Sequence, residues 1–179
     1  ALNRRGQSVD GAIHLLGHGG DAMRAVFPSA TGGSEGDSLR ILGRTVGQGA
    51  GRHLVDGRSL LLAQSVRAVL PLEVAVGQVS TAGTGELDAR LVVIRNAQVT
   101  DTVSVPFVGR VLTVGVGDAE FEALLLSQNG FGAPIVPGTP VISMAGLLVP
   151  DPDLAGAWQL IPRSQGDVQF GTPPPPPGG

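Results

Sequence analysis

Short apolar segments separated by glycine and proline constrain this chain more than any other feature. The 179 residues include 28 Gly and 14 Pro. Because both are scattered rather than periodic, they exclude a collagen helix and favour many turns. The segments between them have the length of strands and are rich in Val, Leu and Ile. The pattern therefore predicts an all-β protein.

Five segments are the best strand candidates: residues 91–94, 111–116, 123–126, 141–149 and 158–161. Residues 59–70 fit either a helix or a strand followed by a turn, because their Leu and Val residues follow neither period strictly. We expect the core to take most of the large aromatic side chains, which are Phe27, Phe107, Phe121, Phe131 and Trp158.

An internal repeat organises these segments. Residues 20–25 match the start of residues 117–123, and residues 36–43 match residues 138–146 with one extra residue in the later copy. Each copy has the order glycine–acid turn, strand, loop, Gly, strand, Gly. The repeat predicts two similar β units, a tandem arrangement in one chain.

The two predicted units are not equally complete. We assign residues 1–71 to a partial or diverged unit, residues 72–168 to a complete one, and residues 169–179 to a Pro/Gly-rich tail or linker. The opening strand of the first unit would lie before Ala1 or be shortened to residues 2–9. We therefore expect that the chain begins part-way through a longer parent, or that a partner covers the open sheet edge.

The second unit resembles the OB-like domains that accompany secreted bacterial nucleases of the endonuclease/exonuclease/phosphatase type. The similar residues are 87–101 (LDARLVVIRNAQVTD), Gly138, 146–148 and 158–168 (WQLIPRSQGDV). The resemblance implies an OB-like Greek-key barrel of five strands, whose loops and one face are used for binding. The catalytic residues of those nucleases lie in a separate domain, and we find no equivalent here.

Composition excludes several kinds of chemistry. The chain has no Cys, and all 12 of its basic residues are Arg, which rules out thiolate metal sites, cysteine nucleophiles and lysine-based phosphate loops or Schiff bases. No apolar run is long enough to cross a membrane as a helix. We therefore predict a protein that is not an enzyme and needs no cofactor.

Charge is distributed unevenly between the two units. Residues 1–71 carry eight Arg against five acidic residues, whereas residues 72–179 carry four Arg against ten. If the protein binds single-stranded nucleic acid, we expect phosphate contacts from Arg40, Arg44, Arg52 and Arg58. Arg40 and Arg44 have the even spacing of one strand face. Because few aromatic rings remain for base stacking, tight autonomous binding is not expected.

Two further groups of polar residues are candidate sites. His14 and His18 are a weak candidate metal site that needs a third ligand, such as His53. Asp118, Glu120 and Glu122 alternate, which favours a solvated strand face with Phe121 and Ala123 pointing inward. We expect surface roles for both groups.

Two functions follow from these observations. The first is a non-catalytic binding or assembly module of an exported or cell-envelope protein, which docks on a larger protein partner or on a domain of its parent chain. The alternative is a nucleic-acid-binding accessory domain of a secreted nuclease. Ala rather than Met at position 1 fits removal of a signal peptide, so we expect an extracytoplasmic location.

Overall fold

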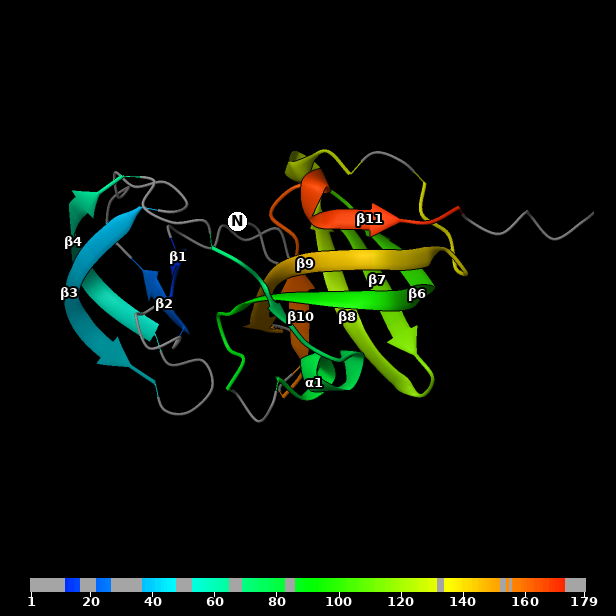
Figure 1. Ribbon diagram of the computed structural model, residues 1–179, viewed down its shortest axis with the longest axis horizontal. Helices are drawn as coiled ribbons and strands as arrows, with labels where there is room; N and C mark the ends of the chain where they lie inside the picture. The colour runs from blue at the N-terminus through cyan, green and yellow to red at the C-terminus, as the bar shows by residue number, and fades with distance from the viewer. Residues whose placement is uncertain are drawn as a thin grey trace, which may run out of the picture.

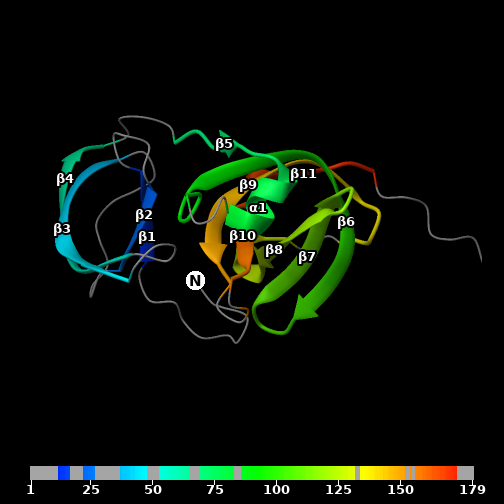
Figure 2. The same cartoon turned by 90° about the horizontal axis from the view of Figure 1, so that it is seen from below.

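The structure is a computed structural model that describes residues 12–16, 22–26, 37–47, 53–64, 69–82, 86–131, 134–151, 154 and 156–172. These residues form two β-sheets and one short α-helix. The prediction of an all-β chain is confirmed. The two sheets occupy successive parts of the sequence and lie apart from each other in both views (Figures 1 and 2).

The second sheet contains a closed barrel of five strands. Its members are β6 (Leu91–Val105), β7 (Gly109–Val116), β8 (Ala119–Leu126), β9 (Pro140–Pro150) and β10 (Trp158–Ile161). Around the barrel, β6 pairs with β7, β7 with β8, β8 with β10, β10 with β9, and β9 with β6. Only the β8–β10 pair is parallel. The five predicted strand segments are thus the five barrel strands.

Shorter elements complete this sheet at its margins. β5 (Leu72–Glu73) pairs in parallel with β6, and β11 (Val168–Phe170) pairs antiparallel with β9. Gln169 and Phe170, which the sequence assigned to the tail, therefore belong to the barrel sheet. The sheet also has two 3₁₀ turns. The turn η2 (Ser127–Asn129) directly follows β8, and the turn η3 (Gln165–Asp167) directly precedes β11.

The helix α1 (Val76–Thr81) lies at one end of the barrel, against β8 and β10 (Figures 1 and 2). The Gln78 side chain accepts a hydrogen bond from the Ala75 N–H at 2.9 Å, which satisfies a donor at the start of the helix. Val76 and Val79 are buried. The helix thus adds apolar side chains to the barrel core and covers its end.

The barrel encloses one main apolar core. Alternate side chains of each strand point inward, as the period of a β-strand requires, and Leu112 and Val114 of β7 are both fully buried. The other strands contribute Val92, Ile94, Val99, Phe121, Leu125, Met144, Leu148, Trp158 and Leu160. Burial of each large aliphatic side chain stabilises the fold by about 1.5–3 kcal/mol.

The aromatic residues do not all follow the prediction. Phe121 and Trp158 are buried in the core, and Phe131 packs against it. Phe107 was expected in the core, and this is wrong: its side chain is 96% exposed. It lies in the turn between β6 and β7, where the neighbouring residue Val108 takes the buried position. Phe27 lies outside the described residues.

The first sheet consists of β1 (Ala12–Leu16), β2 (Ala22–Val26), β3 (Ser38–Val46) and β4 (His53–Ala63). Its order is β1-β2-β4-β3. The helix considered for residues 59–70 is wrong, because β4 continues to Ala63 and pairs with β3. The local sequence of this segment allowed either a helix or a strand, and pairing with the distant strand β3 selected the strand.

Candidate functional site

Three of the four Arg residues predicted to contact phosphate, Arg40, Arg44 and Arg58, lie on the β3–β4 ribbon of the first sheet. Arg40 is directly opposite Leu60, and Leu42 is directly opposite Arg58. Because directly paired residues project to the same side of a sheet, these four side chains share one face. All four are exposed, Leu42 by 71% and Leu60 by 58%. We call this set the Arg–Leu face.

Arg44 lies beyond an irregularity in the same ribbon. The register shifts between Leu42 and Arg44, and Asp56 on the facing strand adopts a positive φ of 55°. Arg44 Nη2 lies 3.3 Å from Asp56 Oδ2, and both side chains are exposed. Such an exposed pair contributes at most about 1 kcal/mol, but it compensates the Arg44 charge. Arg52 lies outside the described residues.

The weak metal site is only partly described. His14 belongs to β1 and is opposite Arg24 in the register, but its side chain is outside the described part, as is the whole of His18. His53, the suggested third ligand, begins β4 and is opposite Val46. Within the part of the chain that the structure describes, no group of three His, Asp or Glu side chains is placed to hold a metal ion.

The acidic residues Asp118, Glu120 and Glu122 lie in or next to β8, where they alternate with apolar residues. Phe121 and Ala123 of β8 are buried. Glu120 and Asp118 are exposed, whereas Glu122 is half-buried. Exposure is confirmed for Glu120, where alternation along β8 is its cause, and for Asp118, which lies in the turn before β8.

Sequence reasoning missed Phe107 as a candidate binding residue. It lies at the tip of the β6–β7 hairpin with a positive φ of 64°, a conformation that is unfavourable for a bulky residue. Its ring is almost fully exposed, and Val103 on the same hairpin is 54% exposed. The sequence signal was present, because Pro106 and Gly109 flank the position and indicate a turn.

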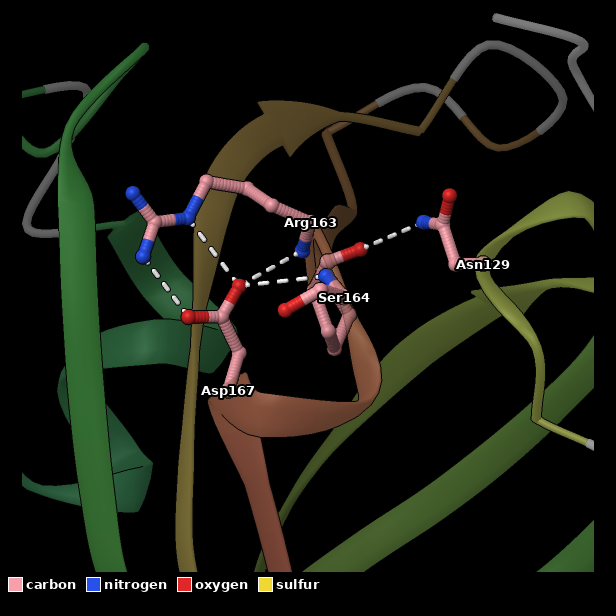
Figure 3. A network of polar contacts seen from close by, with 5 residues as sticks. Asn129, Arg163, Ser164 and Asp167 are labelled. Carbon is pink, nitrogen blue, oxygen red and sulfur yellow. Dashed lines mark hydrogen bonds and ion pairs between the residues drawn. The ribbon is translucent and has the colours of Figure 1, made fainter. Parts of the chain in front are cut away.

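A second polar cluster forms where the chain leaves β10 (Figure 3). The Asp167 carboxylate accepts hydrogen bonds from the Arg163 backbone N–H at 2.9 Å, from Arg163 Nε at 3.0 Å and from the Ser164 N–H at 3.2 Å. Arg163 Nη2 donates to the other carboxylate oxygen at 2.7 Å. Nearby, the Asn129 side chain donates to the Pro162 carbonyl at 3.1 Å.

The electrostatics of Asp167 follow from this geometry. Burial raises the pKa of its carboxyl group, but hydrogen bonds from the Arg163 side chain, the Arg163 charge and the backbone N–H groups of Arg163 and Ser164 together outweigh burial. The pKa of Asp167 is therefore lowered from its ordinary value. The Pro-Arg-Ser run that suggested a nuclease-associated domain is here a structural corner joining β10 to β11.

The edges of the first sheet are its most unusual feature. β1 and β3 are the outer strands, and among the described residues nothing pairs with their outer edges. Among the residues of β2, β3 and β4 whose exposure is described, Ala25 is the one buried apolar residue. An uncovered sheet edge and exposed apolar side chains are both liabilities that proteins normally cover.

The two sheets correspond strand by strand. β1–β2 is antiparallel like β7–β8, β2–β4 is parallel like β8–β10, and β4–β3 is antiparallel like β10–β9. Two glycines matched by the sequence repeat also agree. A Cβ at Gly146 would lie 2.8 Å from the Ile161 carbonyl carbon, and one at Gly43 would lie 2.9 Å from the Val55 carbonyl oxygen. Both glycines permit close approach of the neighbouring strand.

Comparison with known proteins does not assign this chain to a family. Among the described residues, no helix has the length and apolar character to span a membrane. No protein-family model matches the sequence, and no curated protein matches it.

Proposed function

We propose that this chain is a non-catalytic binding or assembly module of an exported or cell-envelope protein, and that it docks on a larger partner through its first sheet. The supporting observation is that this four-stranded sheet has two outer strands without described partners and exposes the large apolar residues Leu42, Leu60 and Leu62. Exposed apolar side chains next to uncovered strand edges favour association with another protein.

The architecture proposed for both units is the OB-like barrel. Numbering the barrel strands 1 to 5 along the chain gives the circular order 1-2-3-5-4, with strands 3 and 5 parallel. This order fits a five-stranded Greek-key barrel, in which one face and two loops bind ligands. The strand-by-strand correspondence and the two matched glycines support a tandem repeat, in which the described residues of the first copy include no counterpart of strand 1.

Site-specific photo-crosslinking tests the docking surface. A crosslinking amino acid at Leu42 or Leu60 should trap one larger protein in native cells. The matched control is Val116, a strand residue of the barrel that is 49% exposed, and crosslinking from it should trap nothing at a comparable level. Light scattering on the chain purified from native extract should show a complex larger than the monomer. A stable monomer that yields no crosslinked partner from the first sheet would contradict the proposal.

A second function, single-stranded nucleic-acid binding as a nuclease accessory, is favoured by a different observation. Arg40 and Arg58 share the Arg–Leu face without the carboxylate neighbour that Arg44 has, and Phe107 offers one exposed ring. A salt-dependent gel shift tests it. Replacing both Arg40 and Arg58 by Ala should reduce the slope of log K against log salt by about 1.4. Absence of any shift at low salt would rule out this function.

A further inference from the structure

We propose that the space between β1 and β3 receives an extended segment of the partner, which runs antiparallel to both strands and closes the first sheet into a five-stranded barrel. The inference rests on the proposed docking function and specifies how docking occurs. It predicts recognition through backbone hydrogen bonds, with specificity from alternate side chains.

The barrel of the same chain provides the template for this segment. β6 is 15 residues long and pairs with two strands in succession. Its first half, from Leu91 to Gln98, pairs with β9, and its second half, from Gln98 to Val105, pairs with β7. Because β3 and β1 correspond to β9 and β7, the incoming segment would pair first with β3 and then with β1.

The interior side of the first sheet identifies what the segment would cover. Ala25 is fully buried and is opposite Leu54, which is opposite Thr45 on β3. Alternation along β3 then places Leu39 and Ile41 on the same side as Thr45. Leu39 and Ile41 are only half-buried. An added strand could therefore bury the apolar surface that they still expose.

The required chemistry of the segment follows from β6. Its buried residues are Val92, Val93, Ile94, Ala97 and Val99, and the polar residues Arg95, Asn96 and Gln98 between them are exposed. The apolar residues among residues 1–11 are only Ala1, Leu2 and Val9, and the same segment includes two Arg. Its sequence therefore does not match the pattern of apolar and polar residues in β6. A segment from the partner fits better, with acidic residues at outward positions because the Arg–Leu face is basic.

Hydrogen–deuterium exchange on the full chain tests the inference. The probe is a synthetic peptide with the sequence of residues 91–105, blocked at both ends. The control peptide has Asp at the positions of Ile94 and Val99, which removes two inward side chains. With the probe, amides of β1 and β3 should exchange at least ~10-fold more slowly, while those of β7 and β9 should not change. The control peptide should have no effect.

A fused variant supports the same test without relying on peptide solubility. Residues 1–11 are replaced by a copy of residues 91–108, so that the added strand and its turn precede Ala12. A tethered strand has a high effective concentration, and β1 and β3 should be protected in this variant. The same fusion with the two Asp substitutions should leave both strands as fast to exchange as in the natural chain.

Three results would overturn the inference. Slow exchange of β1 and β3 in the free monomeric chain would mean that these edges are already paired within the chain. Protection that depends on protein concentration would mean that a second copy pairs with them. No protection by either the peptide or the fusion would mean that the space does not accept a strand. If crosslinking from Leu42 and Leu60 nevertheless traps a partner, docking through the sheet stands and strand addition alone fails.

Discussion

Replacing Asp167 by Ala should destabilise the barrel by removing a buried acceptor. The carboxylate accepts four hydrogen bonds, two from backbone N–H groups and two from the Arg163 guanidinium. The Asp167 side chain is 10% exposed and that of Arg163 is 32% exposed. Because water can replace part of the guanidinium contact but less of the backbone contacts, we expect a loss of about 2–4 kcal/mol.

Urea unfolding monitored by Trp158 fluorescence measures this loss. Trp158 is the only tryptophan in the chain and is buried in the barrel core, so its signal reports on the barrel alone. The control is Asp118→Ala in an exposed turn, which should change stability by less than about 0.5 kcal/mol. Combining Asp167→Ala with Arg163→Ala gives the coupling energy of the pair.

The reasoning would be refuted by an Asp167→Ala variant as stable as the control variant. It would also be refuted by additive effects of the Asp167 and Arg163 substitutions, because residues that share hydrogen bonds should couple. A change in the denaturant slope would indicate an altered denatured state and would require a second probe.

Three further predictions follow from individual contacts. Stability should fall as pH drops from about 4, the unfolded carboxyl value, through the lowered pKa of Asp167, since its contribution is present only while it is ionised; Asp167→Asn should remove this pH-dependent part in acid titrations. Gly146→Ala should cost about 1–3 kcal/mol in urea unfolding, because its Cβ would meet the Ile161 backbone; equal stability would contradict this. Phe107→Asn should raise the melting temperature slightly, because Asn tolerates positive φ better; a lower melting temperature would show that the ring has unrecognised packing.

The barrel strands were largely determined by local sequence. Residues 158–161, ended by Pro162, form β10 with the predicted bounds, because proline cannot donate to a ladder. The alternation around Phe121 also predicted that Phe121 and Ala123 of β8 point into the core while Glu120 is exposed. In both cases the deciding interactions are near in sequence.

The candidate site was only partly predictable. Even spacing placed Arg40 on a strand face, but the sequence did not indicate that Arg58 would lie opposite Leu42, on the same face as Arg40. It also did not indicate that Arg44 would contact Asp56, since that contact depends on a register shift between strands. Phe107 was misassigned because hydrophobicity alone does not distinguish a core position from a turn.

Sequence by itself determined that this chain forms short strands and where the five strands of the barrel lie. Tertiary structure alone decided that residues 59–63 extend β4, that β8 and β10 are parallel, and that β1 and β3 form the outer strands of an open sheet. The physical reason is that strand pairing joins residues far apart in the chain. Its free energy depends on the partner strand and not on the segment itself.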